Sequence, residues 1–192
     1  MRRLSPRQLN YIMAVDHSIS DLRYPVGEFH PPASIDRARL DAWIADIEAL
    51  PGNLRKAVEG LGDDQLDTPY RPGGWTIRQI VHHVADGHLN AYTRFRLALT
   101  EQTPTVKPFE PDAWAELADA KWGPIEPSLA LLDGLHRRWV ALLRSLSDED
   151  FKRAYRRPSG EVPVLDAILG YFAWHCRHHV AQILSLRERR GW

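Results

Sequence analysis

The sequence predicts an all-α fold, a four-helix bundle with a long excursion between its second and third helices. Two observations carry this prediction. Apolar residues recur at three- and four-residue spacing in four long windows, and the alternation typical of β-strands is nearly absent. Stretches rich in proline and glycine separate the windows. The length of 192 residues fits one domain with a sizeable core.

The first helix is predicted to begin after the dipeptide Pro31-Pro32, with Ser34 as its N-cap, and to end near Leu61. Pro51 lies inside this window. Because a proline removes a backbone N–H and clashes with the preceding turn, we expect a kink or a break there.

The second helix is predicted over residues 75–100. Residues 102–125 follow it and are interrupted by prolines and a glycine, so they predict an excursion with one or two helical turns. This excursion is longer than most loops, which makes it a candidate for lining a site or for contacting a second subunit. The third and fourth helices are predicted over residues 127–146 and 163–189.

The composition of the chain excludes some classes of binding partner. Basic residues (25) balance acidic residues (25), which argues against a nucleic-acid partner. The only cysteine, Cys176, cannot form an intrachain disulfide, and no secretory apolar region lies near the N-terminus, so we expect a cytoplasmic protein. The longest apolar stretch, residues 167–174, is far too short to cross a bilayer, and no membrane partner is expected.

Three histidines cluster in the stretch WHCRHH at residues 174–179 of the fourth helix. His175 and His179 are four residues apart and share an otherwise apolar face, so both should point inward. His178 lies on a neighbouring face that is also largely apolar. Periodicity alone therefore leaves a His175/His178 pair open as well.

The second helix offers two more imidazoles, His82 and His83. His83 shares a face with apolar residues, which predicts that it is the more buried of the two. Gly87 lies one turn further along, where the missing side chain suits either a bound molecule or close helix packing.

These histidines have two interpretations: hydrogen-bonded core residues or metal ligands. Burying three imidazoles without partners is costly. Three neutral imidazoles suit zinc or nickel, and they leave one position for water or substrate, as catalytic sites do. Spacing alone gives the two interpretations similar weight.

Several separated stretches make the sequence recognisable. They are DLRYPVGEF (21–29), YRPGGWTIRQIVHHVADGH (70–88), YTRFRLALTE (92–101), TPTVKPFEPDAWAEL (103–117), GYFAWHCRHHVAQI (170–183) and the terminal SLRERRGW. In these stretches the sequence resembles the DinB-like superfamily, in particular its YfiT-type branch of proposed metal-dependent hydrolases. The resemblance covers roughly residues 21–192. Residues 1–20 have no counterpart in it and are interpreted as an N-terminal extension that we expect to be mobile.

The resemblance implies a four-helix bundle, a homodimer, and one divalent metal ion per subunit, either zinc or nickel. It also implies the ligands. The first lies eight residues after the tryptophan that opens the second helix, which selects His83, and the others form an H-x-x-x-H pair, which selects His175 and His179. Gln182 departs from the pattern, because the resemblance implies a further histidine there.

Three functions remain open at this stage. The first is hydrolysis of a small molecule by metal-activated water, for which no catalytic base is assigned. The second, also implied by the resemblance, is an S-transferase that conjugates bacillithiol, mycothiol or glutathione to electrophiles. The third is a non-catalytic dimerisation module with a structural metal. For the dimer, the excursion carries Trp114 and Trp122, which either contact a second subunit or fold back over the bundle.

Overall fold

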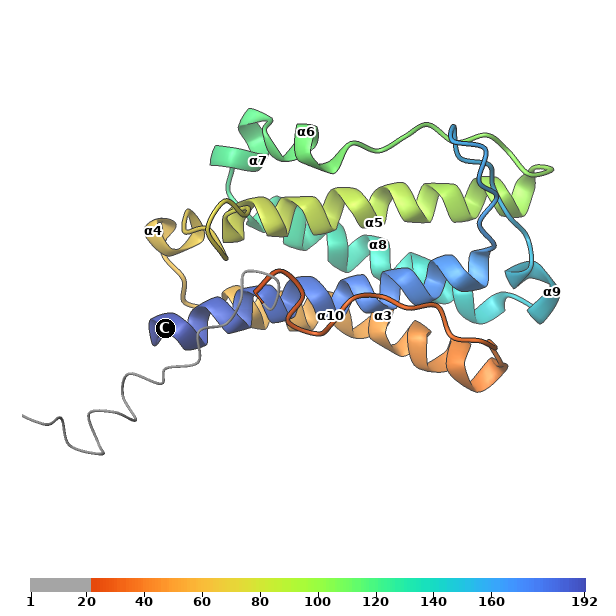
Figure 1. Cartoon of the computed structure of the whole chain (residues 1–192), viewed down its shortest axis with the longest axis horizontal. Helices are drawn as coiled ribbons and strands as arrows, with labels where there is room; N and C mark the ends of the chain where they lie inside the picture. The colour runs from red at the N-terminus through yellow and green to blue at the C-terminus, as the bar shows by residue number, and fades with distance from the viewer. Residues whose placement is uncertain (1–21) are drawn as a thin grey trace, which may run out of the picture.

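Four long helices form the bundle in the computed structural model, which describes residues 22–192 (Figure 1). They are α3 (Arg37–Val58), α5 (Ile77–Thr100), α8 (Glu126–Ser145) and α10 (Leu165–Arg190). Four short helices lie in the connections: α4 (Asp63–Leu66), α6 (Pro111–Ala115), α7 (Ala118–Trp122) and α9 (Asp148–Phe151). The predicted all-α fold is therefore confirmed. The expectation for residues 1–20 lies outside the described residues.

The order of the helices around the bundle is α3, α8, α5 and α10, and each of them packs against two neighbours. Figure 1 shows that α5 and α8 run in one direction, whereas α3 and α10 run in the other. Since α5 has 24 residues, it ends about 36 Å from where it begins. The chain must travel back over that length before α8 can start beside it, which explains the long excursion.

The excursion is the return path. It passes along α5, and its two short helices, α6 and α7, pack on that helix. This confirms the prediction of one or two helical turns between residues 102 and 125. The excursion folds back over its own bundle, while Trp122 stays exposed on its outer face.

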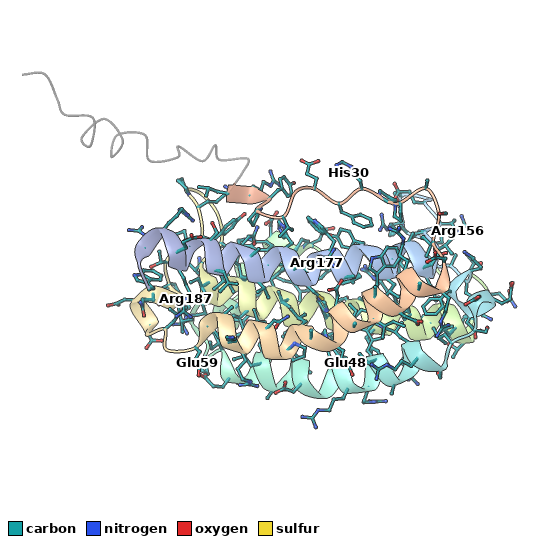
Figure 2. The ribbon with its side chains drawn as sticks, turned by 90° about the horizontal axis from the view of Figure 1, so that it is seen from below. His30, Glu48, Glu59, Arg156, Arg177 and Arg187 are labelled. Atoms are coloured by element: carbon teal, nitrogen blue, oxygen red, sulfur yellow. The ribbon has the colours of Figure 1, made fainter. Side chains whose placement is uncertain are left out.

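The pair α3 and α10 approaches closely, because Gly170 has no side chain to hold them apart. A Cβ atom there would lie 2.7 Å from the Trp43 ring. Charged groups close the rim of this contact: Arg177 pairs with Asp46, and Arg187 donates to the carbonyl oxygen of Glu59 at 3.0 Å (Figure 2). The contact holds the histidine-bearing helix α10 firmly against the bundle.

Helix α3 continues through Pro51, so the predicted break is wrong. A proline cannot donate to the carbonyl four residues earlier, which here belongs to Ile47. The imidazole of His136 on α8 fills that place, since its Nδ1 lies 2.5 Å from the Ile47 oxygen. The carbonyl therefore keeps a hydrogen bond, and the helix is tied to α8 at the same point.

The predicted ends of the long helices are accurate to within a few residues. Helix α5 begins after the N-cap Thr76, whose hydroxyl accepts from the N–H of Gln79, while the Gln79 side chain accepts from the N–H of Thr76. The cap of α3 is Asp36 rather than Ser34. The single turns α4 and α9 were not predicted, because four residues carry too little apolar periodicity to register.

Among residues 22–192, no helix is both long enough and apolar enough to cross a membrane.

Candidate metal centre

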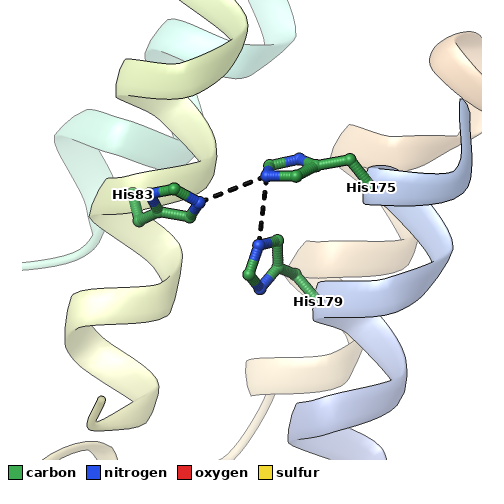
Figure 3. A group of neighbouring side chains, drawn as sticks. All are labelled: His83, His175 and His179. Atoms are coloured by element: carbon green, nitrogen blue, oxygen red, sulfur yellow. Dashed lines mark hydrogen bonds between the residues drawn. The ribbon is translucent and has the colours of Figure 1, made fainter. Parts of the chain in front are cut away.

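Three imidazoles from two helices converge in the interior (Figure 3). The Nε2 atom of His175 lies 3.2 Å from Nε2 of His83 and 3.1 Å from Nε2 of His179. One nitrogen from each of the three residues lies within 4.8 Å of the others, and all three residues are buried. Of the alternatives that spacing left open, the structure brings together His83, His175 and His179.

The geometry of the cluster fits a metal ion. Zinc binds histidine nitrogen at about 2.0 to 2.1 Å, and tetrahedral ligands at that distance are about 3.3 to 3.4 Å apart. The two separations of 3.1 and 3.2 Å are close to this value. Three imidazoles also leave one tetrahedral position open. The donor set therefore suits a borderline ion such as zinc or nickel.

Burial keeps these imidazoles neutral. Desolvation, together with the neighbouring His178, lowers the pKa of His83 to about 4. Desolvation and the surrounding histidines also hold the pKa values of His175 and His179 well below their ordinary range. At neutral pH each ring consequently has one nitrogen lone pair that it can offer to an ion.

A glutamine orients one member of the cluster. The side-chain oxygen of Gln182 lies 2.9 Å from Nδ1 of His179, and its nitrogen lies 2.9 Å from both the carbonyl oxygen of Arg23 and Nε2 of His178. Because the amide oxygen can only accept, Nδ1 of His179 must carry the proton. Its Nε2 lone pair then points into the cluster. Gln182 thus supports the site although a histidine was expected there.

A fourth buried histidine supports the cluster from the other side. Nε2 of His88 lies 3.1 Å from Nδ1 of His175. The His88 ring in turn stacks on His136, with 5.0 Å between the ring centroids. Sequence reasoning missed His88, although it lies five residues after His83 on the same helix. An imidazole beside the second nitrogen of His175 fixes the orientation of that ring.

The other candidate residues lie outside the cluster. His82 faces α8 and α7, with Nδ1 2.8 Å from the hydroxyl of Ser128. His178 stacks on Trp174 at 4.4 Å, and its Nε2 lies against Gln182. Its ring packs edge-on against His179 at 4.8 Å, but it is not one of the three residues whose nitrogens converge. Cys176 is buried in a different part of the bundle, where desolvation raises the pKa of its thiol well above the ordinary value.

A cavity of about 570 Å³ opens beside the three imidazoles, which form part of its lining. Trp75 covers one side of His83, with ring centroids 4.5 Å apart, and Phe109 from the excursion stacks on the same ring at 6.2 Å. Gly87 also lines the cavity, and a Cβ atom added to it would lie 3.8 Å from His175 and 3.9 Å from Phe109. The glycine therefore leaves space beside the cluster and does not serve close helix packing.

No carboxylate takes part in this lining among the described residues. Asp86, the nearest acidic residue in sequence, lies outside it. Desolvation and the neighbouring Asp119 raise the pKa of Asp86 to about 6. The cavity is of the size that small-molecule sites have.

The fold and this cluster define a class: four-helix bundles with a candidate three-histidine centre beside a small-molecule cavity. Residues 37–183 match the DinB superfamily. A protein of Bacillus cereus, named as a proposed metal-dependent hydrolase, is 52% identical over 174 residues, which is 91% of this chain and 100% of that protein. The chain belongs to the DinB superfamily.

A second relative has both a sequence and a solved structure. YfiT of Bacillus subtilis (strain 168), also named as a proposed metal-dependent hydrolase, is 50% identical over 173 residues, which is 90% of this chain and 97% of YfiT. Its structure is described as "a probable metal-dependent hydrolase with an unusual four-helix bundle topology". The two structures agree with a TM-score of 0.86 over 90% of this chain and 99% of that one.

The neutral histidines should make the metal-free protein sensitive to acid. An unfolded imidazole binds a proton near pH 6.5, whereas burial lowers the pKa of His136 in the folded chain to about 4. Below pH 6.5 the unfolded chain therefore binds more protons than the folded one. Stability is full above that pH and falls toward pH 4, by up to about 1.4 kcal/mol per pH unit for each such histidine.

Urea unfolding between pH 7.5 and pH 5, with a chelator present, measures this slope. His136→Leu should make the slope shallower, whatever it does to the stability at pH 7.5. His30→Gln removes an exposed histidine, which is solvated in both states, and should leave the slope unchanged. A free energy of unfolding that does not depend on pH over this range would contradict the interpretation.

Proposed function

We propose that His83, His175 and His179 together bind one divalent ion per chain, zinc or nickel, and that the protein is an enzyme acting on a small molecule in the adjoining cavity. The observation that carries the proposal is the convergence of three buried, neutral imidazole nitrogens at the wall of a cavity. The names of the relatives, which refer to metal-dependent hydrolysis, support it. An ion that only stabilised the bundle would not need such a cavity beside it.

Hydrolysis is the reaction that we favour. A bound ion of this kind would supply Lewis acidity and would lower the pKa of a bound water molecule to about 7. The residues of the chain bind the ion, orient its ligands and exclude water. The three histidines hold the ion, Gln182 and His88 orient two of them, and Trp75 and Phe109 shield the cluster from bulk water.

Alanine substitutions test the ligand set. Metal content should collapse in His83→Ala, His175→Ala and His179→Ala, because each removes one of three donors. It should survive in His82→Ala and His178→Ala, which serve as matched controls from the same two helices. Elemental analysis gives the metal content, and the protein should be purified without a nickel column, since that resin can load the site.

Two results would count against the ligand assignment. One is loss of metal from either control while circular dichroism shows an intact fold. The other is retention of a full equivalent of metal by any of the three ligand variants.

Thiol transfer is the second candidate. The observation in its favour is that no carboxylate lines the cavity among the described residues, so a general base for water is not evident. A thiol needs less help, because its ordinary pKa is near 8.5 and a soft-tolerant ion stabilises the thiolate.

An assay with a model electrophile and a panel of low-molecular-weight thiols separates the two reactions. Bacillithiol, mycothiol and glutathione form the panel, and ester and amide substrates form the hydrolytic arm. If hydrolysis is correct, product forms without any thiol and requires the metal. Metal-dependent consumption of thiol with no hydrolysis would reject hydrolysis in favour of transfer.

We also propose a homodimer built on the outer face of the excursion. Trp122 is 71% exposed and Leu117 is 54% exposed, and exposed apolar groups of this size often mark interfaces. Trp114, by contrast, packs edge-on against Phe109 of its own chain at 4.9 Å.

Light scattering at tens of micromolar should give the dimer mass, and Trp122→Ser should shift the protein toward monomer. A monomer in the unsubstituted protein would reject the proposal.

A further inference from the structure

Three cationic side chains line the same cavity, and each comes from a different part of the chain. Arg94 lies near the C-terminal end of α5, Lys107 lies in the excursion, and Arg157 lies in the connection between α9 and α10. Hydrogen bonds hold these segments together. Arg94 donates to the carbonyl oxygen of Lys107 at 3.0 Å, and the N–H of Val106 donates to the carbonyl oxygen of Arg156 at 3.0 Å. The cations are therefore assembled by the fold and are not neighbours on one exposed helix face.

The charge around the cavity is unbalanced, although the whole chain has equal numbers of acidic and basic residues. None of the described side chains that line the cavity is acidic. One carboxylate approaches the group from outside: Glu161 pairs with Arg157 at 2.8 Å. Within residues 22–192 neither Arg94 nor Lys107 forms an ion pair, so the cavity keeps a positive excess. A charged cavity with low-dielectric walls concentrates ions of the opposite sign.

Arg94, which contacts the backbone of Lys107, lies well along α5 from the histidine cluster. From His83 to Arg94, α5 advances about 16 Å along its axis. Helical side chains lean toward the N-terminus, so the guanidinium of Arg94 reaches back over part of that distance. Between the two ends, the lining is largely apolar and includes Ile168, Phe172 and Val106. A molecule of roughly 10 Å could span the gap with its middle against this wall.

We infer that the substrate has an apolar body with an anionic group at one end, and that Arg94, Lys107 and Arg157 bind this anion while the other end meets the histidine cluster. The inference rests on the proposed function for the identity of the reacting end. The anion subsite itself depends only on the three cations and the cavity. Binding of the anion fixes the orientation of the substrate in the cavity. The reactive group of the substrate, rather than its charged group, then faces the histidines.

The test uses two probes with the same apolar body. One is 4-phenylbutane-1-sulfonate, whose anion is a weak metal ligand, and the other is the neutral 4-phenylbutan-1-ol. Isothermal titration calorimetry on the full chain as purified should show at least about tenfold tighter binding of the sulfonate. Added salt should weaken binding of the sulfonate but not of the alcohol, since salt screens partly exposed charges.

Substitutions locate the subsite. Lys107→Gln and Arg157→Gln should each weaken sulfonate binding by about three- to tenfold and leave alcohol binding unchanged. Both side chains are largely exposed, so the fold should tolerate the changes. Arg137→Gln is the matched control: it removes the same charge from a different cavity and should leave both affinities unchanged.

Equal affinity for the two probes, or equal weakening by Arg137→Gln, would overturn the inference. The outcome is separable from that of the proposed function. Metal content is measured on the same samples, and neither cation variant should change it. If the protein binds no metal but the cation-dependent preference persists, the metal proposal fails and the subsite stands. If the histidines bind metal but the preference is missing, the subsite alone fails.

Discussion

The parallel course of α5 and α8 is the constraint on which the rest of the structure depends. Two long helices that follow one another in the chain and lie side by side can run in the same direction only if the chain returns outside the bundle. Here the return path lies along α5, the helix that presents His83. Residues 106–109 and Pro111 of this path become one wall of the cavity. A topological requirement of the bundle therefore also supplies the cover of the histidine cluster.

The second constraint is the cost of burying imidazoles. His83, His88, His175 and His179 all lie in the interior, and burial disfavours their protonated forms. Hydrogen bonds compensate part of this cost and at the same time fix which nitrogen carries the proton. Gln182 does so for His179. The result is a set of lone pairs aimed at one point, an arrangement that stabilises the fold little by itself but suits a cation well.

Much of the fold and of the histidine cluster could be predicted from the sequence. The four long helices have strong apolar periodicity, and the inward phase of His175 and His179 follows from their four-residue spacing. The choice of His83 over His82 came from the resemblance, and the structure brings His83 into the cluster. That these residues bind metal stays a prediction, as does the dimer.

Other features depend on contacts between segments that are far apart in the sequence. The approach of His88 to His175 requires the packing of α5 against α10. The three cations of the cavity lie at positions 94, 107 and 157, and only the return path and the final connection bring them together. No local sequence pattern identifies such residues. They lie far apart along the chain, and only the folded structure brings them together.

The hydrogen bond from His136 to the carbonyl oxygen that Pro51 leaves without a backbone donor has an evolutionary consequence. The carbonyl of Ile47 accepts from an imidazole because the proline cannot supply the usual backbone donor. Exchanging the histidine alone would leave a buried carbonyl without a partner. Exchanging the proline alone would introduce an N–H that competes with the imidazole for the same oxygen. Positions 51 and 136 lie on different helices and are 85 residues apart in the sequence. They should nevertheless change together as sequences diverge, because both determine the hydrogen bonding of the same carbonyl oxygen.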